Sequence, residues 1–158
     1  MRVTDGSATD LEKVYRAQSE RLYRALLAYS GDPRVAEDAL AEAFAHALRN
    51  RGQMRDPTRW VWSVAFRVAK GQLAQRHRES GELTDLGYDM PEPMRDLLAA
   101  LAELSPMQRA SIVLFHFADY PVKEIAKMLD TSSAAVKVHL SQGRKRMRVW
   151  LSEEPSDV

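Results

Sequence analysis

The chain has 158 residues, of which 45% are hydrophobic and 28% charged, with a formal net charge of +1. This length suits one ordinary domain or two small ones, and the hydrophobic fraction excludes a disordered chain. There is no cysteine, which excludes disulfides, zinc fingers and thiol catalysis. An acidic, polar N-terminus and the lack of a long apolar run argue against a signal peptide and a membrane span, so we expect a cytoplasmic protein without membrane insertion.

The first two predicted helices are marked by capping patterns. Thr9 and Glu12 form a capping-box pattern, which predicts a helix from Thr9 to about Ser30. Asp32-Pro33 predicts the start of a second helix, because aspartate caps free N–H groups and proline fits the first turn. Gly52 is expected to end this helix, which has one apolar face rich in alanine.

The third predicted helix, about 57 to 78, begins at Asp56-Pro57 and has apolar residues on two sides. Such a helix is either buried on both sides or offers one side to a partner. The aromatic side chains Trp60, Trp62 and Phe66 therefore have two interpretations, as core residues or as partner contacts. We expect at least one of them to be exposed.

Residues 79–93 predict a linker, because glycine, serine and proline interrupt an acidic segment there. Helices are then expected at about 94–104, at about 105–118, and twice more up to residue 151. No strand alternation of useful length appears. The sequence therefore predicts an all-α fold of two small helical domains, with three helices in the first and four in the second.

Positive charge is concentrated in two stretches far apart in the chain. Residues 55–78 contain six lysine or arginine side chains against one carboxylate, and residues 132–150 contain five against none. Clustered positive charge is typical of proteins that bind a polyanion, although a solvated helix face produces the same pattern.

The segment 120–151 predicts a helix-turn-helix. A short amphipathic helix from Val122 to Leu129 is followed by a polar turn and a longer helix capped by Ser132 or Ser133. In this motif the second helix enters the major groove of DNA. We expect Lys137, His139 and Gln142 to project near one another toward bases, and Arg144 and Lys145 to contact phosphates or pack.

Several segments of the sequence resemble a known family. Leu104-Ser-Pro-Met-Gln-Arg109, Lys123-Glu-Ile-Ala126 and Ala135-Val-Lys-Val-His-Leu140 resemble region 4 of extracytoplasmic-function sigma factors, of the sigma-70 family. Ala36-Glu-Asp-Ala-Leu-Ala-Glu-Ala-Phe44 is similar to region 2.2 of the same family, and residues 60–78 are similar to its regions 2.3 and 2.4. The resemblance covers residues 9–151 in the family's order. Some positions depart from the pattern, among them His139, which stands where arginine is frequent.

The resemblance implies an alternative sigma factor without catalytic activity, metal or cofactor. Region 2 would occupy residues 8–78 and region 4 residues 94–152. Its partners would be the clamp helices and flap of core RNA polymerase, and promoter DNA. Many relatives are held inactive by an anti-sigma factor, and the sequence does not decide whether this chain has such a partner. The polymerase-binding residues implied are Glu37, Asp38, Glu42 and Phe44. Contacts to the minus-ten element are implied for the segment 50–55 and for Trp60, Trp62, Phe66, Arg67, Lys70 and Arg76. Contacts to the minus-thirty-five element are implied for Ser132, Ser133, Lys137, His139, Gln142, Arg144 and Lys145.

Two other functions would each explain part of the sequence. A helix-turn-helix regulator that acts without core polymerase would explain residues 120–151, but it leaves the first half unexplained. A metalloenzyme would use Glu37, Asp38 and His46 as ligands. The sequence contains no second ligand cluster and no glycine-rich phosphate loop to support this interpretation.

Overall fold

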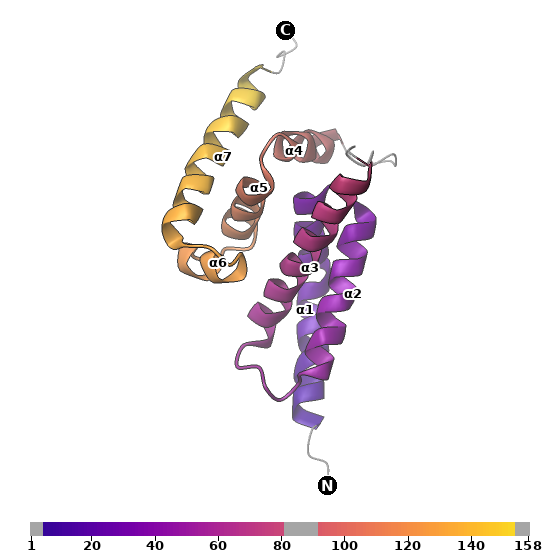
Figure 1. Cartoon of the computed structure of the whole chain (residues 1–158). Coiled ribbons are helices and arrows are strands. Elements are labelled where there is room, and N and C mark those ends of the chain that lie inside the picture. Colours follow the sequence, from indigo (N-terminus) through magenta and orange to yellow (C-terminus); the bar gives the residue numbers. More distant parts are fainter. Residues whose placement is uncertain (1–4, 81–91, 154–158) are drawn as a thin grey trace. The chain divides into compact units, whose positions relative to one another are not determined.

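The computed structural model describes residues 5–80 and 92–153, and the described residues are helical and contain no strand (Figure 1). The chain divides into two compact units, Met1–Thr84 and Asp85–Val158. The predicted all-α class is confirmed. Most of the predicted linker lies outside the described residues, and its two ends belong to the flanking helices.

Unit 1 consists of three helices that pack against one another: α1 (Asp5–Ser30), α2 (Pro33–Arg49) and α3 (Pro57–Ser80). The prediction that Thr9 caps α1 is wrong, because the helix already includes the four residues before it. A capping pattern inside a helix therefore looks the same in sequence as one at its start.

The two Asp-Pro pairs begin their helices as predicted. Asp32 has an extended backbone, and its Oδ1 accepts a hydrogen bond from the Arg34 N–H at 2.9 Å. Asp56 accepts from the Arg59 N–H at 3.2 Å. Helix α2 ends at Arg49, and the Asn50 side chain then donates to the His46 carbonyl at 2.8 Å. Asn50 rather than Gly52 therefore caps this helix.

Small side chains allow α2 and α3 to approach closely. The α2 alanines at 36, 39, 43 and 47 are fully buried, as are Val61, Ala65 and Ala69 of α3. Because these side chains are short, the two backbones meet with little between them.

The other apolar side of α3 packs against α1. Trp62 and Phe66 are each about 1% exposed, and their rings stack with centroids 6.2 Å apart. The Phe66 ring also packs against that of Tyr29 of α1, with centroids 5.4 Å apart. The Trp62 Nε1–H donates to Gln18 Oε1 at 2.9 Å. Both apolar sides of α3 are thus buried inside unit 1.

Unit 2 contains α4 (Glu92–Ala102), α5 (Pro106–Ile112), the π-helical segment η1 (Val113–Phe117), α6 (Val122–Met128) and α7 (Ser133–Glu153). The helix predicted at 105–118 is therefore α5 continued by a π turn, in which the Ala118 N–H donates to the Val113 carbonyl at 3.1 Å. Helix α7 packs against α4, α5 and α6.

Three polar residues fix the connection between α4 and α5. Ser105 and Gln108 form a reciprocal capping box at the start of α5, with bonds of 3.2 and 3.1 Å. The buried Arg109 donates to the Leu104 carbonyl at 3.0 Å and so satisfies backbone near the end of α4. The chain between the two helices is thereby fixed.

We expect the ion pair between Arg76 and the buried Asp32 to stabilise unit 1, because it ties α3 to the start of α2. Replacing Arg76 with methionine should lower the free energy of unfolding by about 1–3 kcal/mol, since the Asp32 carboxylate, only 3% exposed, then loses a charged partner. Arg24→Met removes a surface pair with Glu20 and should cost less than about 1 kcal/mol. Urea unfolding in a Trp150→Phe background, where tryptophan fluorescence reports unit 1 alone, measures both. If both variants lose the same free energy of unfolding, the buried ion pair does not stabilise unit 1 more than a surface pair does.

Candidate nucleic-acid interface

The helix-turn-helix of unit 2 is formed by α6, a short turn and α7. Asp130 adopts a left-handed backbone, with φ of 55°, and the next N–H, of Thr131, bonds to the Ala126 carbonyl at 2.9 Å. Ser132 caps α7 by accepting from the Ala135 N–H at 3.0 Å. Ile125 and Val136 are fully buried between the two helices. The predicted helix-turn-helix is confirmed, with Ser132 as the capping residue.

The side of α7 that faces away from the rest of unit 2 forms a continuous exposed strip. We name it the outer strip, and it consists of Ala134, Lys137, Val138, Ser141 and Lys145. Val138, near its centre, is 51% exposed. No aspartate or glutamate occurs between residues 131 and 152, so nothing on this helix repels phosphate before its final residue. The outer strip is therefore the part of α7 best suited to a DNA groove.

The predicted grouping of Lys137, His139 and Gln142 is wrong. His139 is half-buried, and its Nδ1 is buried without a hydrogen-bond partner among the described residues. Gln142 is exposed, but its Oε1 accepts from Gln108 Nε2 at 3.2 Å. The reason is helical geometry, because two residues along a helix correspond to a rotation of about 200°. Lys137 and His139 therefore lie on nearly opposite sides of α7.

Arg144 is held by the π segment. Its Nε–H donates to His116 Nε2 at 3.0 Å, and its guanidinium lies 5.4 Å from the centroid of the Phe115 ring. Since His116 accepts at Nε2, its ring is neutral and carries its proton on Nδ1. Partial burial, followed by the positive charge of Arg144, lowers the pKa of His116. Arg144 thus has partners within unit 2, whereas Lys145 stands on the outer strip.

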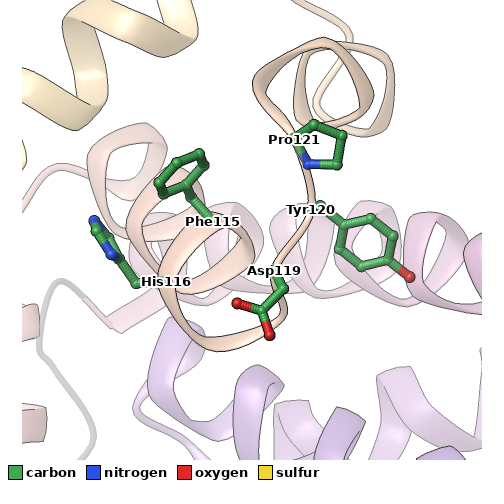
Figure 2. A pocket seen from close by; sticks show the side chains of 5 residues that line it. All are labelled: Phe115, His116, Asp119, Tyr120 and Pro121. Carbon is green, nitrogen blue, oxygen red and sulfur yellow. The ribbon is translucent and has the colours of Figure 1, made fainter.

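A shallow hollow of about 290 Å³ lies beside this pair (Figure 2). Its walls come from the end of the π segment and from the loop before α6. Asp119 turns the chain there with a positive φ of 62°. The lining residues are Phe115, His116, Asp119, Tyr120 and Pro121.

In unit 1 the structure corrects two of the predicted DNA contacts. Trp62 and Phe66 are core residues, because α1 covers their side of α3. Arg76 is paired with Asp32, and its side chain is 37% exposed. Among the three aromatic side chains of α3, only Trp60 is partly exposed. Its ring lies 5.6 Å from that of His46, and its Nε1 is buried without a partner among the described residues.

Arg67 and Lys70 are exposed on the face of α3 between its two packed sides. Of the predicted DNA-binding residues of α3, Trp62 and Phe66 are therefore buried, whereas Trp60, Arg67, Lys70 and Arg76 are at least partly exposed. The burial of Trp62 and Phe66 could not be read from the sequence, since a doubly apolar helix does not reveal which neighbour covers it.

The predicted polymerase-binding residues lie on the exterior of α2. Glu37 and Asp38 are exposed, and Glu42 is paired with Arg49 at 3.4 Å. Phe44 is half-buried and meets Tyr15 of α1 edge to face, with centroids 5.0 Å apart.

Sequence reasoning missed two further apolar residues of this surface, Tyr15 and Leu48, which are each 51% exposed. The signal for Leu48 was its place one turn after Phe44 on the same helix. Together with Phe44 they add an apolar component to the acidic surface.

Among the described residues, no group of three or more histidine or acidic side chains is arranged to hold a metal ion. None of the described helices combines the length and hydropathy that a membrane span requires.

We expect His116 to titrate below the ordinary histidine pKa of about 6.5, because the folded state favours its neutral ring. The stabilisation from this contact is then complete above about pH 6.5 and is lost as the pH falls through the lowered folded-state pKa. Histidine NMR spectra recorded against pH measure this midpoint. Arg144→Ala should raise it, whereas Lys145→Ala, which removes a neighbouring charge on the outer strip, should leave it nearly unchanged. A midpoint at or above the ordinary value in the unaltered protein would contradict the contact.

Comparison with known proteins places the chain in a family. Residues 94–147 match the family described as Sigma-70, region 4. The chain is 26% identical over 170 residues to RNA polymerase sigma factor CarQ of Myxococcus xanthus, with 99% of this chain and 98% of that protein covered. It is 25% identical to the ECF RNA polymerase sigma factor SigE of Mycolicibacterium smegmatis, with 93% of this chain but only 63% of that protein covered.

The fold agrees with the sequence comparisons. The sigma factor RpoE of Bartonella quintana, solved with the anti-sigma factor NepR, is similar with a TM-score of 0.72 at 20% identity, covering 96% of this chain and 99% of that one. These findings favour a sigma factor over a regulator that acts without core polymerase. The chain belongs to the extracytoplasmic-function sigma factors of the sigma-70 family.

Proposed function

We propose that this chain is an alternative sigma factor that binds core RNA polymerase, recognises promoter DNA and initiates transcription of a specific regulon. It acts in the cytoplasm as a non-enzymatic subunit. The observation that carries this proposal is the outer strip of α7, an exposed helix face with two lysines and no carboxylate, in the unit that matches sigma region 4. Transcription in vitro with purified core polymerase, with and without the chain, tests it directly.

In this proposal unit 2 places α7 in the major groove of the minus-thirty-five element and also meets the polymerase flap. The outer strip faces the bases, and Lys137 and Lys145 contact phosphates at its two ends. Ser132 and Ser133, at the start of α7, approach the backbone, because a helix N-terminus attracts phosphate. Arg144 keeps its bond to His116 and holds the π segment against α7.

Unit 1 engages the minus-ten element through the N-terminal end of α3 and the segment 50–55 before it. Trp60 offers a partly exposed ring for stacking on an unpaired base, and Arg67 and Lys70 follow the phosphates. Trp62 and Phe66 support this surface from within the core.

The proposal extends to an anti-sigma partner. The RpoE structure that this chain resembles in fold was solved as a complex with the anti-sigma factor NepR. An equivalent partner of this chain would bind the surfaces that the polymerase uses, so that the two exclude each other.

We expect Asp38→Ala to weaken binding of core polymerase by about 5- to 30-fold, the range of one or two kcal/mol for a charge at an interface. Asp38 is exposed on α2, so the variant should fold normally. Fluorescence anisotropy with labelled sigma factor measures the affinity. Glu20→Ala removes an exposed carboxylate of α1 and is the matched control. Unchanged affinity for folded Asp38→Ala would refute the docking surface on α2.

We expect Trp60→Ala to impair promoter opening more than closed-complex binding, since stacking on an unpaired base is worth about 1–3 kcal/mol. Permanganate reactivity of promoter thymines reports opening, and electrophoretic mobility at low temperature reports the closed complex. Trp60→Phe retains an aromatic face and should recover part of the opening. If Trp60→Ala loses both activities equally, its effect is on folding and the stacking role is wrong.

A further inference from the structure

Val138 is the one large apolar side chain of the outer strip, whose other members are Ala134, Lys137, Ser141 and Lys145. It is 51% exposed, whereas Val136 and Leu140 on the inner side of α7 are at most 2% exposed. Lys137, Ser141 and Gln142 are its polar neighbours on the helix surface, and Ala134 lies one turn before it. A β-branched residue also loses side-chain freedom in a helix, so neither propensity nor core packing explains a valine there. Single exposed apolar residues are common, and the argument therefore depends on what this one would face.

The position of Val138 on the helix determines what it would face. Val138 is the sixth residue of α7, about 8 Å along the axis from the first, at 1.5 Å per residue. A recognition helix presents its first two turns to base edges. The basic, carboxylate-free outer strip makes DNA the occupant that matches this face in charge.

The major groove offers few groups that an apolar side chain such as Val138 can contact favourably. Its edges present hydrogen-bond donors and acceptors, and one apolar group, the C5 methyl of thymine. An isopropyl side chain can neither donate nor accept a hydrogen bond. Its favourable contact in the groove is therefore with the thymine methyl, because this contact removes both apolar surfaces from water.

We propose that Val138 packs against the C5 methyl of a thymine in the minus-thirty-five element and so determines the base preferred at that position. Lys137 and Ser141, on either side, are left to contact neighbouring polar edges or phosphates. This inference rests on the proposed function, because it takes α7 to be the helix in the groove.

The test replaces thymine with uracil, which lacks only the methyl. A promoter is first selected from random DNA with the wild-type holoenzyme. Each thymine of its minus-thirty-five element is then changed singly to uracil, and the binding of holoenzyme is measured. One of these changes should weaken binding about threefold to fivefold, the effect of one buried methyl group. In Val138→Ala holoenzyme the same change should have no effect, and thymine DNA should bind as weakly as uracil DNA does to the wild type.

The matched control is Val149→Ala, because Val149 is a valine of α7 with nearly the same exposure, 49%. That variant should keep the full uracil effect, and Val138→Ile should keep it too. The inference is overturned if no thymine shows the effect in the wild type, or if Val138→Ala leaves the effect intact. A loss of core affinity in Val138→Ala, with the uracil effect kept, would show a protein contact instead. Failure of the wild-type holoenzyme to select any promoter would overturn the proposed function as well.

Discussion

Unit 1 depends on one packing constraint, the burial of α3 on two sides at once. The alanine-rich face of α2 covers one side closely, and α1 covers the aromatic side with Tyr29 and Gln18. Only the remaining face and the N-terminal end of α3 are left for a partner. This constraint leaves Trp60 partly exposed and Arg67 and Lys70 exposed, and it places Trp62 and Phe66 in the core.

A similar division runs along α7. Its inner side packs against α4, α5 and α6. Polar residues next to that side are held by hydrogen bonds, Gln142 by Gln108 and Arg144 by His116. Gly143 lies between them, where a Cβ would come within 3.1 Å of Ile112. The helix is therefore fixed in rotation against α5, and this rotation decides which residues reach the outer strip.

The sequence predicted the features that depend on local chemistry. The Asp-Pro pairs fix where α2 and α3 begin, and the apolar spacing of residues 125–140 predicts the helix-turn-helix. What it did not predict depends on contacts between distant residues. A basic side chain such as Arg76 looks like a phosphate ligand until Asp32, 44 positions away, is found beside it. Likewise, charge alone did not separate Arg144, which is bound to His116, from Lys145, which is exposed.

The π segment holds one residue more than a regular helix would need. A π turn holds one residue more than an α turn, so Val113–Phe117 has the form of a single-residue insertion into an otherwise continuous helix. A homologue one residue shorter here would keep a regular helix, but His116 would be rotated by about 100° from its present direction. Arg144 would then lose its hydrogen-bond acceptor. The number of unpaired positive charges on α7 would thus change through a deletion in a different helix, without any change in the basic residues themselves.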